Sequence, residues 1–168
     1  MLLYEDIITG DEMFSDAFPI KEVDGIVYEV DCAMVTVKAG ADVDIGANPS
    51  AEEQDEGVED GAITVNNVVH SFRLQSTQFD KKSYLTYLKD YMKAIKAKLQ
   101  ETSPDQVEAF EKGAQAFAKK IVGNFKNYEF YTGESMNPEG MVALLDYRED
   151  GTTPYITFWK HGLKQVKL

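Results

Sequence analysis

Two amphipathic helices between residues 80 and 122 are the clearest pattern in the chain. The first carries apolar residues at alternating spacings of three and four, with Asp80 before it as a candidate N-cap. This stripe consists of Leu85, Leu88, Met92, Ile95 and Leu99, with Tyr84 and Tyr91 beside it. The second stripe consists of Val107, Phe110, Ala114, Phe117, Ala118 and Ile121. The short connection between them predicts an antiparallel helical hairpin at residues 80–122, whose inner stripes pack on each other and on a sheet.

The boundaries of the second helix are also marked. Ser103-Pro104-Asp105-Gln106 has the pattern of a capping box, with proline at the first helical position and an acid in the first turn. Gly123 follows the last apolar position and is expected to end the helix.

The rest of the chain favours β-structure. Strands are expected at residues 3–8, 26–30, 34–37, 62–69, 72–74, 128–132, 141–147 and 154–159, and turns at 24–25, 137–140 and 149–151. Residues 26–37 are interpreted as a hairpin, and residues 11–16 as a short helical turn that places Phe14 in the core. The pattern predicts an α+β protein in which a β-rich core of antiparallel sheets carries the protruding helical hairpin, in a single domain spanning residues 1–168.

Acidic residues are concentrated in one segment. Eight acids and no lysine or arginine lie between Ala41 and Gly61, and they account for most of the formal charge of −12. Such a segment buries too little apolar surface to offset the entropy of ordering it, so we predict a flexible acidic loop at residues 39–61. Asp42, Asp44, Glu52 and Glu53 loosely resemble a calcium loop, which supports low-affinity calcium binding at most. The alternative is a solvated tether that keeps the protein soluble.

Lysines are concentrated in the hairpin instead. Residues 80–122 contain nine lysines and six acids. Lys89, Lys93 and Lys96 are spaced to share one face of the first helix, away from its apolar stripe. This basic ridge is suited to an acidic partner such as a tubulin tail or ribosomal RNA, with salt-sensitive affinity. The alternative is an ordinary solubilising surface.

Residues for catalysis are few. The chain has one cysteine and two histidines, and it lacks a nucleophile elbow, a phosphate-binding Gly-Lys loop and a dinucleotide-binding glycine set. We therefore expect no enzyme activity, with Cys32 in the core and His70 and His161 at turns or on the surface. The single cysteine fits a reducing compartment. The sequence has no apolar run long enough to span a bilayer and no signal peptide. We therefore expect a cytosolic monomer that binds neither membranes nor specific nucleic-acid sequences.

Several longer strings resemble one known family. They are Ile45-Gly46-Ala47-Asn48-Pro49-Ser50-Ala51-Glu52, the segments 124–138 and 147–151, Asp11-Glu12-Met13-Phe14-Ser15-Asp16, and Lys89-Asp90-Tyr91-Met92-Lys93. Together they resemble the translationally controlled tumour protein family over essentially the whole chain. Its two signatures correspond here to Gly46, Asn48, Ser50 and Glu52, and to Gly133 and Glu134.

The resemblance implies both a fold and a set of partners. The family's core is similar to that of small chaperones that bind nucleotide-free Rab GTPases, although those carry zinc-binding cysteines that this chain lacks. By resemblance, Glu12 and Glu134 are expected to contact a partner, Glu12 a small GTPase, and the hairpin is expected to bind tubulin. The expected function is a cytoplasmic, cytoskeleton-associated interaction protein that acts in protein synthesis through ribosomes or translation factors and stabilises microtubules. The alternatives are a GTPase-binding chaperone or regulator and, more weakly, a calcium-binding protein without other cofactors.

Overall fold

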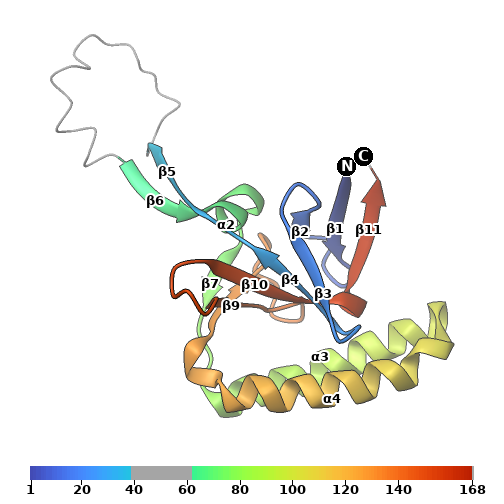
Figure 1. The fold of residues 1–168 in the computed structure, drawn as a ribbon. Coiled ribbons are helices and arrows are strands. Elements are labelled where there is room, and N and C mark those ends of the chain that lie inside the picture. Colours follow the sequence, from blue (N-terminus) through green and yellow to red (C-terminus); the bar gives the residue numbers. More distant parts are fainter. Residues whose placement is uncertain (39–61, 168) are drawn as a thin grey trace, which may run out of the picture.

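The computed structural model describes residues 1–38 and 62–167, which form antiparallel sheets and a helical hairpin (Figure 1). The three-stranded sheet has the order β11 (Leu163–Lys167), β1 (Leu2–Asp6), β2 (Glu12–Ser15). The six-stranded sheet has the order β3 (Ile20–Val23), β4 (Val27–Asp31), β10 (Pro154–Trp159), β9 (Ala143–Tyr147), β8 (Glu129–Thr132), β7 (Gln75–Thr77). A separate ribbon pairs β5 (Met34–Lys38) with β6 (Ala62–Asn66). The α+β class predicted from the sequence is confirmed.

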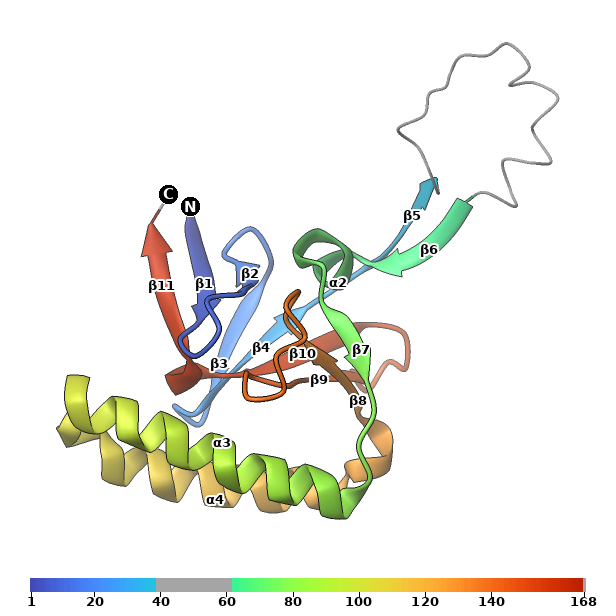
Figure 2. The same cartoon turned by 180° about the vertical axis from the view of Figure 1, so that it is seen from behind.

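The helices are α2 (Asn67–Phe72), α3 (Lys81–Thr102) and α4 (Val107–Gly123), with short 3₁₀ turns η3 (Pro104–Gln106), η4 (Phe125–Asn127) and η5 (Lys160–Gly162). α3 and α4 run side by side as the predicted antiparallel hairpin, visible from both sides in Figures 1 and 2. In the parts of the chain that the structure covers, no helix is both long and apolar enough to cross a membrane.

The six-stranded sheet lies between the hairpin and the three-stranded sheet. Neighbouring residues of β10 point to opposite faces, as the pleat of a strand requires. Phe158 packs against Phe14 of β2, with ring centroids 4.4 Å apart, whereas Trp159 meets Phe117 of α4 edge-on at 5.6 Å. One cluster of buried side chains therefore joins both sheets and the hairpin.

Helix α3 begins where the sequence predicts. Asp80 accepts a hydrogen bond from the Ser83 backbone amide at 2.7 Å, and its own amide donates to the Ser83 hydroxyl, so a capping box closes the first turn. The predicted apolar stripe is partly wrong, because the two tyrosines beside it face the sheet and the stripe is rotated. Tyr84 and Tyr91 are buried, whereas Leu85 is 41% exposed.

The start of the second helix also differs from the prediction. Ser103 has φ −150° and ψ 65° and makes no side-chain capping bond, so the predicted capping box is absent from this turn. Residues 104–106 form a 3₁₀ turn instead, and α4 begins at Val107. The expected end of the helix at Gly123 is confirmed.

Several strand predictions are wrong because pairing depends on distant segments. Residues 26–37 do not form a hairpin, since β4 pairs with β3 and β10 while β5 pairs with β6. Residues 11–16 contain strand β2 instead of a helical turn, although Phe14 is fully buried as predicted. The expected strand at 62–69 ends at Asn66, whose side chain caps α2. The strand expected at 72–74 is the end of that helix, where Arg73 has φ +56°.

Candidate functional site

A groove runs along the hairpin between α3 and α4. Its floor and walls are apolar and consist of Leu85, Leu88, Met92, Phe110, Ala114 and Ala118. Its polar border consists of Lys89, Lys93, Lys96, Glu111 and Gln115. We call this 480 Å³ feature the hairpin groove. All three lysines of the predicted ridge line it together with Leu85, Leu88 and Met92, so the prediction that the ridge lies away from the apolar stripe is wrong.

The three lysines do not have equal surroundings. Lys96 Nζ lies 3.0 Å from a Glu111 carboxylate oxygen, so its charge is already paired across the two helices. Lys89 and Lys93 are exposed and form no ion pair within residues 1–38 and 62–167. The rotation of α3 that exposes Leu85 puts an apolar wall next to these two ammonium groups.

A second surface brings Glu12 and Glu134 into one polar cleft of about 460 Å³. Arg73 lies between the segments that carry them, with its guanidinium 3.2 Å from the Glu134 carboxylate. Both partners of this ion pair are largely exposed, so it contributes little to stability. No pattern in the sequence predicts Arg73 as a site residue; it lines the cleft from the end of α2, where its backbone is left-handed.

Gly133 of the second signature has a structural role beside this cleft. A Cβ atom at this position would lie only 2.6 Å from the Cβ of Asp11, far inside van der Waals contact. Asp11 in turn accepts a 2.6 Å hydrogen bond from the Ser135 hydroxyl. The glycine therefore lets the signature segment lie directly on the loop before β2.

Gly46, Asn48, Ser50 and Glu52 of the first signature lie outside the described residues, as do the flexible loop predicted at 39–61 and the acids of the predicted calcium loop. Within residues 1–38 and 62–167 no group of three His, Cys, Asp or Glu side chains is arranged to hold a metal ion.

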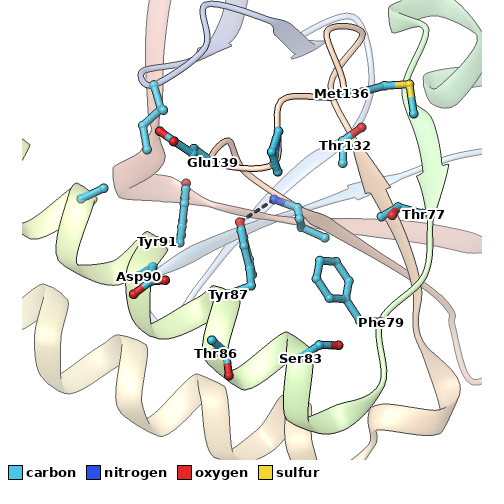
Figure 3. Close-up of a pocket in the computed structure, with 14 residues that line it drawn as sticks. Thr77, Phe79, Ser83, Thr86, Tyr87, Asp90, Tyr91, Thr132, Met136 and Glu139 are labelled. Atoms are coloured by element: carbon cyan, nitrogen blue, oxygen red, sulfur yellow. Dashed lines mark hydrogen bonds between the residues drawn. The ribbon is translucent and has the colours of Figure 1, made fainter.

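A third cleft, which the sequence did not suggest, separates α3 from the segment that follows β8 (Figure 3). It has a volume of about 570 Å³ and is lined mainly by apolar side chains, among them Phe79, Tyr87 and Met136. The Tyr87 hydroxyl donates to the Gly140 carbonyl at 2.7 Å and accepts from the Val142 amide at 2.9 Å. These two bonds fix the segment against the helix.

The two histidines lie apart. His70 is exposed near the end of α2, and His161 is half-buried in η5, edge-on to Phe110 at 5.0 Å. Cys32 is buried and its thiol donates to the Val30 carbonyl at 3.4 Å. The hydrogen bonds of the described residues pair the Cys32 thiol with neither histidine.

Cys32 should be unreactive in the native protein. Burial raises the pKa of its thiol to about 11, so almost no thiolate is present at neutral pH. We expect the thiol reagent dithiobis(nitrobenzoate), whose reaction is followed by absorbance, to label the native protein at least about 100-fold more slowly than the urea-unfolded chain. Rapid stoichiometric labelling of the folded protein would contradict this placement.

Asp150, in the family-like segment 147–151, should titrate at unusually low pH. Its carboxylate accepts hydrogen bonds from the Thr153 hydroxyl at 2.6 Å and from the Thr153 and Thr152 amides at 2.8 Å, which lower its pKa to about 2. The folded pKa lies below the unfolded value of about 3.9, so the bonds stabilise the fold above about pH 4 and this contribution is lost as pH falls toward 2. Thr153→Val should raise the pKa of Asp150 in an NMR titration; an unchanged value would refute the assignment.

The fold and these surfaces define a class of protein: an α+β protein whose antiparallel sheets carry a helical hairpin and whose candidate sites are surface grooves. The family model for translationally controlled tumour protein matches residues 1–164. The chain belongs to the translationally controlled tumour protein family.

The chain is similar to its relatives over the whole length of both proteins. The translationally controlled tumour protein homologues of Yarrowia lipolytica and Saccharomyces cerevisiae are 69% and 62% identical to this chain over 168 residues, covering all of both chains. The solved structure of the Schizosaccharomyces pombe protein is similar with a TM-score of 0.85 at 64% identity, covering all of both chains. The Caenorhabditis elegans structure has a TM-score of 0.73 at 32% identity and covers this chain fully and 99% of its own.

Proposed function

We propose that this protein is a non-enzymatic cytoplasmic interaction protein that supports protein synthesis, binds microtubules, and contacts its acidic partners through the hairpin groove. The observation that carries the proposal is the position of Lys89 and Lys93, exposed and unpaired in the described part of the chain beside an open apolar groove. Apolar contact supplies affinity in such a groove, and the bordering charges supply orientation and selectivity.

The net charge makes this surface selective. The formal charge of −12 is concentrated in residues 41–61 and repels acidic partners there, so the basic ridge provides a favoured approach for them. Tubulin tails, ribosomal RNA and acidic translation factors share the required negative charge. Attraction of this kind weakens as ionic strength rises.

Affinity capture from lysate at near-physiological salt tests the proposal. The wild type is compared with a Lys89→Glu/Lys93→Glu/Lys96→Glu variant, with and without nuclease treatment. The matched control is Lys81→Glu/Lys82→Glu/Lys112→Glu, which changes the charge of the same hairpin equally at positions that do not line the groove. We expect tubulin or ribosomal components to be lost with the first variant and retained with the control. Equal capture by all three proteins would refute the groove as the contact.

A second candidate is binding of a small GTPase at the polar cleft. The supporting observation is that Glu12 and Glu134, distant in sequence, lie in one cleft with Arg73. The test measures nucleotide release from a purified small GTPase with wild-type protein, Glu12→Ala and Glu134→Ala, with Glu139→Ala as a control outside this cleft. Release that is unchanged at excess wild-type protein would refute an exchange activity.

Calcium binding at the acidic segment is a weaker candidate. Its support is compositional, because four acids of the segment have the spacing of a loose calcium loop. Calorimetry on the full chain and on a variant lacking residues 42–60 tests it. Equal heats in the two proteins would exclude a site in that segment.

A further inference from the structure

A fourth cleft lies between the turn of the hairpin and the strands β1, β4 and β11. It has a volume of about 560 Å³, in the range of small-molecule sites. The segments that line it come from β1, β4, the end of α3, η3, η5 and β11. Neither the hairpin groove nor the polar cleft shares a lining residue with it.

The charge of this cleft is opposite to that of the chain. Lys98, Lys160 and Lys164 line it, and none of its lining residues is acidic. The lining therefore carries three ammonium groups and no carboxylate, although Glu22 and Glu5 lie within 4.0 Å of two of them. Such a surface attracts anions.

Two of the three lysines are held in place from outside the cleft. Lys160 Nζ lies 3.1 Å from a Glu22 carboxylate oxygen, and Lys164 Nζ lies 4.0 Å from Glu5. Lys98 has no ion-pair partner within the described residues. Within the described residues the cleft thus has one ammonium group without an ion-pair partner and two in partly exposed ion pairs, which compete only weakly with a bound anion.

Neutral donors add to these charges. Ser103 and Gln106, which the sequence pairs in a capping box, make no such bond and line the cleft instead. Tyr28 and Leu163 add apolar surface to the lining of the same cleft. A phosphate group can accept several such hydrogen bonds at once, and charge-assisted bonds from ammonium groups are the strongest of them.

We propose that this cleft binds a small molecule that carries phosphate groups next to a flat ring, such as a nucleoside diphosphate. The lysines and neutral donors hold the phosphates, and the ring lies against Tyr28 and Leu163. The proposal does not depend on the function assigned to the hairpin groove.

His161 provides a direct spectroscopic readout. It lines the cleft, and its Nδ1 atom is buried without a partner among the residues the structure describes. Burial, followed by the positive charge of Lys160, lowers the pKa of His161, and Glu22 only partly opposes this. Lys98, Lys164 and Glu5 are the other charged groups around the cleft. A bound phosphate adds negative charge nearby, so the pKa of His161 rises when the cleft is filled.

The test titrates the full-length protein with pyrophosphate and, separately, with adenosine diphosphate, using calorimetry and proton NMR of the two histidines. We expect saturable binding of both, tighter for the nucleotide, a raised pKa of His161, and no change in the His70 resonance. An affinity for pyrophosphate equal to that for adenosine diphosphate would overturn the proposed contact with the flat ring of the ligand. No saturable binding of either would overturn the site.

Matched variants separate this cleft from other lysines. Lys98→Gln/Lys164→Gln should lower the affinity at least about tenfold, because two charge-assisted contacts are lost. Lys89→Gln/Lys93→Gln removes the same charge from the hairpin groove and should change it less than about twofold. Unfolding curves of both variants serve as the control for folding. The substituted lysines are exposed, so we expect both variants to fold. Equal losses in the two variants would show non-specific attraction and overturn the proposal.

Discussion

Gly162→Ala should destabilise the protein by about 3 kcal/mol, as measured by urea unfolding. Gly162 lies in η5 directly against the buried Tyr91 of α3. An added Cβ would overlap the Tyr91 hydroxyl, and it would come within 2.8 Å of Met141 Cε and 3.2 Å of Tyr91 Cζ. Since α3 is fixed along its length by the core, the added methyl group has no room. The single tryptophan, Trp159, is buried and reports the unfolding.

A second substitution should partly rescue this variant. The Tyr91 hydroxyl is buried without a hydrogen-bond partner in the described structure, so Tyr91→Phe should be neutral or stabilising by up to about 1 kcal/mol. In the double variant the overlap with the hydroxyl is gone, and we expect a favourable coupling of at least about 1 kcal/mol. Gly123→Ala is the control, because nothing lies within 4 Å of the added Cβ. Additive effects in the double variant would contradict this packing.

Asp6→Ala should cost about 2–4 kcal/mol, for a different reason. Asp6 is 2% exposed and its two carboxylate oxygens accept hydrogen bonds of 2.8 Å from the Ile8 and Met141 amides. The bond to Met141 joins β1 to the segment that precedes β9. Removing the carboxylate leaves two backbone donors without partners, one of them fully buried.

Asp16→Ala is the matched control for this prediction. Asp16 also accepts from a backbone amide, that of Leu2 at 3.1 Å, but on an exposed edge where water can replace the lost bond. We expect its cost to stay below about 1 kcal/mol. A loss of stability as small as this in Asp6→Ala would show that the carboxylate does not join the two segments.

The helical hairpin could be predicted from the sequence because its signals are local. A helix repeats its buried face every three or four residues, so Leu88, Ile95 and Leu99 identify α3 without knowledge of its partners. The face itself was predicted less well. The spacing places the tyrosines beside the apolar stripe, whereas Tyr84 lies in an aromatic cluster with Phe79 and Phe130 and faces the sheet.

The strands were harder because their pairing is not local. β3 and β7 have four and three residues and form only by pairing with β4 and β8. The adjacent valines of α2 favour a strand, and the signal for a helix is Asn66, a good N-cap residue just before it.

Some features of the candidate sites are local in sequence and could be predicted, and others depend on packing between distant segments. Lys89, Lys93 and Lys96 share a helix face by spacing alone, so their clustering could be predicted. The groove beside them depends on the packing of α4, which brings Ala114 and Ala118 opposite α3. The meeting of Glu12, Arg73 and Glu134 depends on three segments far apart in sequence, and no local pattern reveals it.

The most direct test of the central claim, that the hairpin groove binds acidic partners, is co-sedimentation with purified microtubules before and after proteolytic removal of the acidic tubulin tails. The wild type should bind intact microtubules with an affinity that falls about tenfold between roughly 50 and 200 mM salt. Binding should be lost without the tails, or with Lys89→Gln/Lys93→Gln, and retained by Lys98→Gln/Lys164→Gln. Undiminished binding of the Lys89→Gln/Lys93→Gln variant to intact microtubules would contradict the account.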